Sequence, residues 1–158
     1  MKNTSLCYIE QNGRYLMLHR VKKEHDENRD KWIGIGGKFE PGESPEDCVL
    51  RETLEETGLR LTKYRYCGII TFVSDRWETE YMHLFTADRF TGQLKECDEG
   101  VLEWIPWRRM LELPHWKGDE IFLNLIEDET TPFFSLKLHY DEQDVLLSAV
   151  LNGQSLNI

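Results

Sequence analysis

Apolar and polar residues alternate along several segments of the chain, which is the pattern of β-strands. Ser5–Gln11 and Arg14–Val21 flank an Asn12-Gly13 dipeptide, the strongest short-range signal for a β-hairpin. In Thr79–Ala87, large side chains occupy both alternating sets, so both faces of that strand are predicted to be buried. Further strands are predicted at Tyr64–Val73, Val101–Ile105, Phe133–Tyr140 and Val145–Leu151.

A helix is predicted to begin after Ser44 and to end at about Thr57. Ser44 is a favourable N-cap, Pro45 suits the first helical position, and Gly58 supplies the left-handed residue that ends many helices. The side of this helix expected to pack against a sheet carries Leu50, Leu54 and Thr57. Two more helices are predicted, at Trp107–Leu111 and Asp119–Glu127.

Strands and helices mix along the whole chain, which predicts an α/β fold. The sequence has no repeat, low-complexity tract or linker, so residues 1–158 are interpreted as one domain. The charged segment Lys22–Lys31 is interpreted as a solvated connection, with a mobile flap beside a substrate as the alternative.

The composition argues against some classes of binding partner and indicates a cellular location. A formal net charge of −10 argues against a nucleic-acid backbone or an anionic membrane as the main partner. The four cysteines form no CxxC pair, which favours free thiols in a reducing compartment. No apolar run suits a signal peptide or a membrane span, so a cytoplasmic location is expected.

Acidic residues crowd one side of the predicted helix after Ser44. Glu52, Glu55 and Glu56 fall within roughly one ~100° arc, where like charges destabilise a helix by about 0.2–0.5 kcal/mol per pair. A divalent cation reverses the sign of this effect, because Mg²⁺ and Mn²⁺ prefer carboxylate oxygens. The cluster therefore indicates metal-assisted phosphoryl chemistry.

The same stretch resembles the signature of the Nudix hydrolase family, Gx5Ex7REUxEExGU, in which U is a bulky aliphatic residue. The fixed positions are filled by Gly37, Glu43, Arg51, Glu52, Glu55, Glu56, Gly58 and Leu59. Thr53 stands where the family has an aliphatic residue, so slightly poorer packing without loss of chemistry is expected there. The resemblance implies a mixed β-sheet between α-helices, an α/β/α sandwich.

The resemblance also implies a reaction and the residues that perform it. Nudix enzymes cleave nucleoside diphosphates linked to another moiety with Mg²⁺ or Mn²⁺, and a triphosphate would yield a monophosphate and pyrophosphate. Either Glu55 or Glu56 would orient or deprotonate the attacking water. Arg51 is expected to fix the helix through Glu43 or Glu55. The implied metal ligands are the Gly36 carbonyl, Glu52, Glu55 and Glu56, with Glu99 as a further candidate.

Beyond the signature, the chain is similar to the MutT-like oxidised-purine nucleoside triphosphatases, such as 8-oxo-dGTP diphosphatases. The segment from Trp116 to Glu120 resembles their base-binding corner, where a Trp stacks on the purine and Asp residues read its edge. Asp119 matches one such Asp, but Gly118 replaces the other, and Ile33 replaces an Asn that contacts the base. Trp116 could also be a structural aromatic. The candidate substrate contacts are Arg20, Gly37, Lys38, Trp116 and Asp119.

Two other functions stay open from the sequence. One is a Nudix hydrolase acting on ADP-ribose, a dinucleoside polyphosphate or another nucleotide. The other is a regulatory module that binds a nucleotide without cleaving it, although every acidic position of the signature is present. A small-molecule nucleotide is the expected partner in each case, with no nucleic acid and no membrane, and the chain is expected to be a monomer or homodimer.

Overall fold

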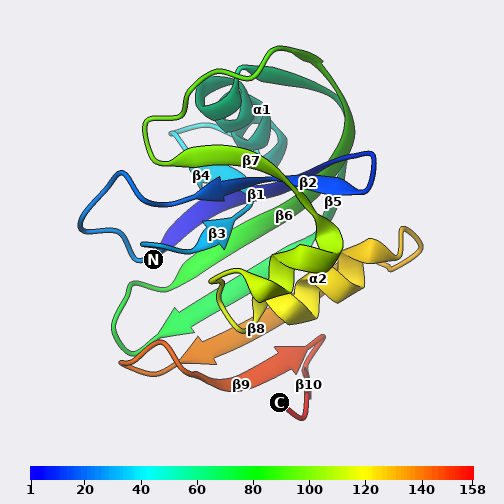
Figure 1. The fold of residues 1–158 in the computed structure, drawn as a ribbon. Coiled ribbons are helices and arrows are strands. Elements are labelled where there is room, and N and C mark those ends of the chain that lie inside the picture. The colour runs from blue at the N-terminus through cyan, green and yellow to red at the C-terminus, as the bar shows by residue number, and fades with distance from the viewer.

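The computed structural model describes all 158 residues. Strands and helices mix along the chain (Figure 1). The helices are α1 (Pro45–Thr57) and α2 (Asp119–Glu127), and η1 (Trp107–Glu112) is a 3₁₀ helix. The strands are β1 (Lys2–Gln11), β2 (Arg14–His19), β3 (Trp32–Ile33), β4 (Ile35–Lys38), β5 (Leu59–Ser74), β6 (Glu80–Gly92), β7 (Val101–Pro106), β8 (Phe134–Tyr140), β9 (Leu146–Leu151) and β10 (Gln154–Ser155).

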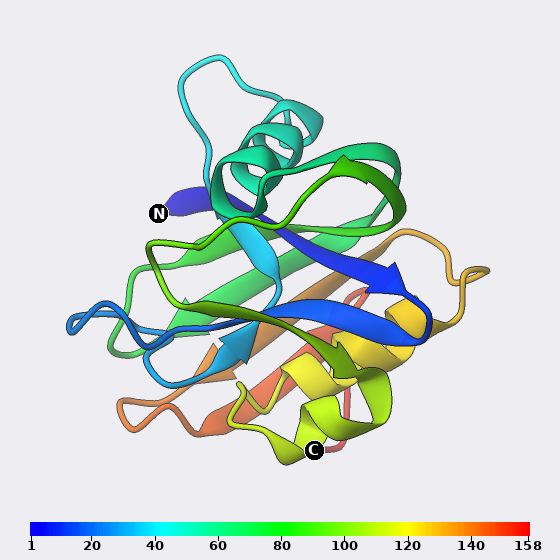
Figure 2. The same ribbon diagram turned by 45° about the horizontal axis from the view of Figure 1, so that its top comes forward.

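The sheet is mixed, and it divides at β1. Strand β1 runs parallel to β6, and β5 runs parallel to β8, whereas the other pairs are antiparallel. On its other edge β1 pairs with β4 through Thr4–Cys7, but with β2 only at Glu10 and Gln11. Strands β2, β3 and β7 therefore turn away from the main sheet, as Figure 2 shows.

Two apolar cores cover the two faces of the sheet. Neighbouring strand residues enter different cores, because successive side chains of a strand point to opposite faces. Leu84 packs in the core that contains Phe122 of α2, whereas Phe85 packs in the core that contains Val49 of α1. This arrangement confirms the expected α/β architecture with a mixed sheet between helices. Neither helix is long and apolar enough to cross a membrane.

Helix α1 has the predicted ends but buries a partly different stripe. Ser44 Oγ accepts the Asp47 N–H at 3.0 Å, and Gly58 adopts φ 80°. The prediction that Leu50, Leu54 and Thr57 form the packed side is confirmed for the buried Thr57 and for Leu50, which packs partly buried against the core. It is wrong for Leu54, which is 36% exposed. The stripe that faces the sheet consists of Cys48, Val49, Thr53 and Thr57. Small residues occupy it because α1 lies close over β1 and β4.

Thr53 is fully buried, and its hydroxyl has no hydrogen-bond partner. An unsatisfied buried hydroxyl costs roughly 1–3 kcal/mol, and valine has nearly the same shape. We therefore expect Thr53→Val to raise the free energy of unfolding by about 1 kcal/mol in urea denaturation. A loss of stability in this variant would show that the hydroxyl contributes a bond.

The remaining differences from the sequence prediction lie mainly in short elements. Strands β3, β4 and β10 have between 2 and 4 residues, too few to produce a recognisable alternation. Strand β5 begins directly after Gly58, earlier than predicted, and β6 extends to Gly92. The segment between β2 and β3 is a loop, as expected from its charge.

Candidate active site

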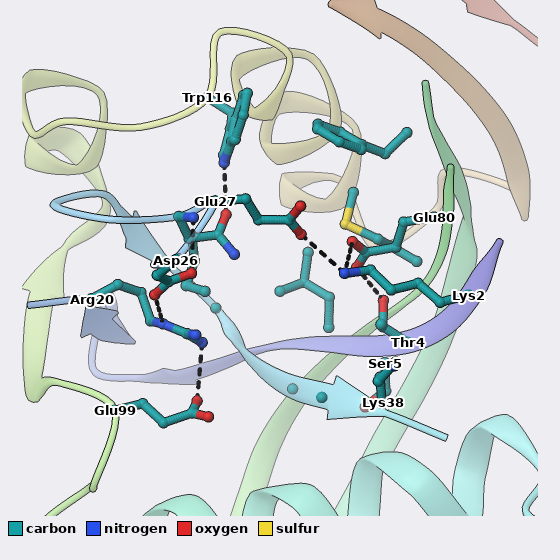
Figure 3. Close-up of a pocket in the computed structure, with 18 of the residues that line it drawn as sticks. Lys2, Thr4, Ser5, Arg20, Asp26, Glu27, Lys38, Glu80, Glu99 and Trp116 are labelled. Atoms are coloured by element: carbon teal, nitrogen blue, oxygen red, sulfur yellow. Dashed lines mark hydrogen bonds and ion pairs between the residues drawn. The ribbon is translucent and has the colours of Figure 1, made fainter. Parts of the chain in front are cut away.

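One cavity of about 580 Å³ lies beside β1 and β4, next to the acidic side of α1 (Figure 3). The structure brings to it most of the residues that the sequence singled out, from segments far apart in the chain. These are Arg20, Gly36, Gly37, Lys38, Glu52, Glu56, Glu99, Trp116 and Asp119. Arg51 and Glu55 do not line it.

Among the acids that line the cavity, Glu56 has a strongly raised pKa. Its Oε2 atom is buried and has no hydrogen-bond partner. Burial, together with the negative charges of Glu99 and Glu52 beside it, raises the pKa of Glu56 to about 9. Burial also raises the pKa of Glu52, and the charges of Glu55 and Glu99 add to this effect. Without a cation, the site therefore keeps a proton among its carboxylates.

Basic side chains hold Glu99 at the mouth of the acidic region. Arg20 Nη1 donates to Glu99 Oε2 at 3.0 Å, and Lys23 Nζ lies 2.9 Å from Glu99 Oε1. Burial alone would raise the pKa of Glu99, but the hydrogen bond from Lys23 and the positive charge of Arg20 lower it. Arg20 also donates from Nε to Asp26 at 2.6 Å. These contacts place two cationic groups next to the carboxylates, where an anionic phosphate could meet them.

Arg51 is the centre of a hydrogen-bond network behind the cavity. It contacts Glu43 through Nε and Nη2 at 2.7 and 2.9 Å, Glu52 at 2.8 Å, and the Lys38 carbonyl at 2.9 Å. The hydrogen bond from Arg51 lowers the pKa of Glu43 to about 2. Arg51 also reaches Glu55 at 3.1 Å, as the i,i+4 spacing predicts, and the Glu55 side chain is 58% exposed. Arg51 therefore joins the loop before α1 to the acidic side of the helix.

The donor set fits a hard divalent cation. Glu52, Glu56 and Glu99 offer carboxylate oxygens, and Gly36 on β4 lines the same region with its backbone. The unpartnered buried oxygen of Glu56 is a position that a cation would satisfy. No three of these acidic side chains already surround one point closely enough to hold an ion. Arg51 and Arg20 hold Glu52 and Glu99 instead.

The opposite part of the cavity is formed by aromatic residues and one buried acid. Trp116 is 6% exposed, and its Nε1 donates to Asn28 Oδ1 at 2.7 Å. The Lys31 ammonium lies 4.4 Å from the centroid of the Trp116 ring. Tyr140 packs edge-on against the same ring. Asp119 lines this part of the cavity beside them.

Burial raises the pKa of Asp119 to about 7. The folded protein therefore keeps a proton that the unfolded chain releases near pH 4, so this residue makes stability fall as the pH rises from about 4 to about 7. We expect Asp119→Asn to lose that dependence, because asparagine does not titrate. Urea denaturation at pH 5 and pH 8 checks this. Relative to the wild type, the free energy of unfolding of the variant should be higher at pH 8 than at pH 5. An equal difference at both pH values would contradict the buried, protonated Asp119.

Sequence reasoning missed a group of polar residues in the same cavity. Lys2 Nζ lies 3.2 Å from Glu27 Oε1 and 3.5 Å from Glu80 Oε1, and Thr4 Oγ1 donates to Glu80 Oε2 at 2.6 Å (Figure 3). Lys2 and Thr4 share one face of β1, as the strand period requires. Glu80 and Glu27, however, reach this face through β6 and the loop after β2, and no local pattern signals that juxtaposition.

The loop between β2 and β3 contributes several residues to the cavity wall. They are Lys23, His25, Asp26, Glu27 and Asn28. Hydrogen bonds of the loop to Arg20, Lys2 and Trp116 connect it to three separate sides of the cavity. The loop therefore forms part of the cavity wall and is not a purely solvated connection.

Comparison with known proteins assigns the chain to a class. The family model of the NUDIX domain matches residues 2–126, so the chain belongs to the Nudix hydrolase family. The Nudix hydrolase YvcI of Bacillus subtilis is 32% identical over 131 residues, covering 80% of this chain and 79% of that protein. The oxidized purine nucleoside triphosphate hydrolase of Danio rerio is 33% identical over 127 residues, covering 79% of each.

A solved structure extends the similarity over nearly the whole chain. The crystal structure of the MutT protein from Bacillus halodurans superposes with a TM-score of 0.84 at 26% identity, covering 98% of this chain and 99% of that one. The protein is therefore a MutT-like Nudix hydrolase.

Proposed function

We propose that this protein is a Mg²⁺-dependent pyrophosphohydrolase that cleaves a purine nucleoside triphosphate to the monophosphate and pyrophosphate. The observation that supports it most is a single cavity with carboxylates and cationic groups in one part and Trp116 and Asp119 in the other. A triphosphate suits the first part, and a base suits the second. The name of the zebrafish relative, an oxidized purine nucleoside triphosphate hydrolase, points to the same substrate class.

In this proposal Glu52, Glu56 and Glu99 hold Mg²⁺, and Mn²⁺ could replace it. The ion, when bound, neutralises phosphate charge and makes water a better nucleophile. Glu56 is the carboxylate proposed to accept the proton of the attacking water, because it lines the cavity whereas Glu55 does not. Binding of a cation would weaken the hold of Glu99 on Arg20 and Lys23, and these side chains would then be free to contact the phosphates.

The base would lie against Trp116, with Asp119 facing its N–H groups. Stacking on a Trp face contributes about 1–3 kcal/mol per base, and a buried carboxyl selects ring or exocyclic N–H donors. Ile33, which lines the cavity near Gly34, adds an apolar contact but no hydrogen bond. An oxidised purine such as 8-oxo-dGTP is the finer form of the proposal.

A panel of nucleotides tests the proposal. Hydrolysis of dGTP, 8-oxo-dGTP, ATP, ADP-ribose and a dinucleoside polyphosphate is compared in Mg²⁺, with pyrophosphate and orthophosphate measured separately and with EDTA as the metal-free control. We expect pyrophosphate from the purine triphosphates and none in EDTA. Equal rates on dGTP and 8-oxo-dGTP would remove the oxidised base from the proposal. Turnover of ADP-ribose alone would identify ADP-ribose, and not a triphosphate, as the substrate. Tight binding without turnover would indicate a regulatory module.

A further inference from the structure

The corner that carries Trp116 and Asp119 is held from outside by strand β8, which follows the segment matched by the family model. Tyr140, the last residue of β8, has no solvent-exposed surface. Its Oη atom accepts the N–H of Gly118 at 2.8 Å, and this bond is buried. Gly118 directly precedes α2 and has no side chain that could cap the helix. The Tyr140 hydroxyl therefore satisfies a buried N–H group at the start of α2.

The ring of Tyr140 also completes an aromatic cluster in the wall of the cavity. Its centroid lies 4.9 Å from that of Trp116, at an interplanar angle of 70°, and 5.3 Å from that of Phe72. Phe72 in turn packs edge-on against Trp116 at 5.1 Å. These contacts hold the indole from two sides. The orientation of the Trp116 ring therefore depends on where β8 places Tyr140.

The space around Gly118 shows how closely the corner fits against β8. A Cβ atom at this position would lie 2.5 Å from Leu138 Cδ1 and 2.6 Å from Tyr140 Oη. Any side chain at 118 would push the corner away from β8.

We propose that Tyr140 is a positioning residue for base recognition: it fixes Trp116 and Asp119 through Gly118, and so sets the preference of the enzyme for purine over pyrimidine nucleotides. The proposal rests on the proposed function, because it assigns the base to the part of the cavity lined by Trp116 and Asp119. Tyr140 lines the cavity beside Trp116 and makes no hydrogen bond with the acids of α1. Its effect should therefore appear only with ligands that carry a base.

The test replaces Tyr140 with phenylalanine, which keeps the ring and removes the acceptor for Gly118. Tyr66→Phe is the matched control, since the Tyr66 hydroxyl contacts His83 and does not line the cavity. We expect Tyr140→Phe to raise KM for dGTP about tenfold, as an unsatisfied buried N–H displaces the corner, while kcat falls much less. The ratio of kcat/KM between dGTP and dCTP should shrink, and Tyr66→Phe should leave it unchanged.

Binding measurements separate this proposal from the proposed function. Calorimetric titration with a non-hydrolysable dGTP analogue and with tripolyphosphate requires no turnover. We expect Tyr140→Phe to weaken binding of the analogue about tenfold and to change binding of tripolyphosphate less than about twofold. Equal weakening of both ligands, or of neither, would overturn the positioning role. Absence of turnover in the wild type would contradict the proposed function alone.

Gly118→Ala tests the same contact between Gly118 and Tyr140 by changing Gly118 instead. The added methyl group meets the ends of two side chains, Leu138 and Tyr140, so the chain can adjust and fold. The variant should show the same selective loss for ligands that carry a base. If Tyr140→Phe were too unstable to measure, this variant would decide the question: a uniform loss for dGTP and tripolyphosphate, or no loss, would contradict the proposal.

Discussion

Replacing Glu56 with glutamine is expected to lower kcat for Mg²⁺-dependent pyrophosphate release by about 10³-fold. The proposed reaction needs this side chain as a carboxylate, both to hold the cation and to accept a proton. Glutamine lacks the negative charge that strengthens cation binding and cannot accept the proton. The fold should persist, because the raised pKa keeps Glu56 protonated in the metal-free protein and glutamine resembles that neutral form. Pyrophosphate release from dGTP measures the loss, and circular dichroism checks the fold.

Two other acids of α1 serve as controls for Glu56→Gln. Glu46 lies in the first turn and does not line the cavity, so Glu46→Gln should keep wild-type activity. Glu55→Gln distinguishes the roles that the sequence left open. Since Glu55 is exposed and held by Arg51, we expect this variant to lose much less activity than Glu56→Gln. A larger loss in Glu55→Gln would mean that Glu55 is the base.

Gly37→Ala should reduce activity about 100-fold while leaving stability almost unchanged. A Cβ atom on Gly37 would lie between 2.4 and 2.7 Å from the carboxylate atoms of Glu52. Such a contact is relieved by rotating the end of the Glu52 side chain, which costs the fold little. The displaced carboxylate would then no longer face the cavity as a ligand. The apparent affinity for Mg²⁺, measured from the dependence of turnover on its concentration, should fall with the activity.

The paired measurement of stability and activity makes Gly37→Ala informative. Thermal unfolding in the absence of metal should show a Tm close to that of the wild type. Retained activity at low Mg²⁺ would mean that Glu52 is not a ligand. A large drop in Tm would mean that the methyl group strains the backbone of β4 rather than moving the carboxylate.

The local features of α1 could be predicted from sequence because they depend on neighbouring residues. Ser44 caps the helix through its hydroxyl, and Gly58 ends it because glycine readily adopts a positive φ. The acids between them share one side. The spacing of the leucines predicts a buried Leu54, but Leu54 is exposed. The close approach of α1 to β1 and β4 favours the smaller Cys48 and Thr53 instead. Tertiary packing decided that stripe.

The site also combines features that depend on neighbouring residues with contacts that depend on the tertiary fold. The clustering of the α1 acids can be predicted from their spacing, whereas Glu99 is a candidate only through the resemblance to the family. By contrast, Glu80 reaches Thr4 through the parallel pairing of β1 with β6, a contact between residues 76 positions apart in sequence. Tyr140 meets Gly118 only because β8 pairs with β5. A single sequence carries no pattern that reports such long-range pairings.

We propose that divalent cations bind among Glu52, Glu56 and Glu99 and there engage a triphosphate. Crystals grown with Mn²⁺ and a non-hydrolysable dGTP analogue would show these cations through the anomalous signal of manganese. We expect anomalous peaks between these carboxylates and the phosphates, with the base beside Trp116. Phosphates bound elsewhere, with no peak at the acids of α1, would contradict it.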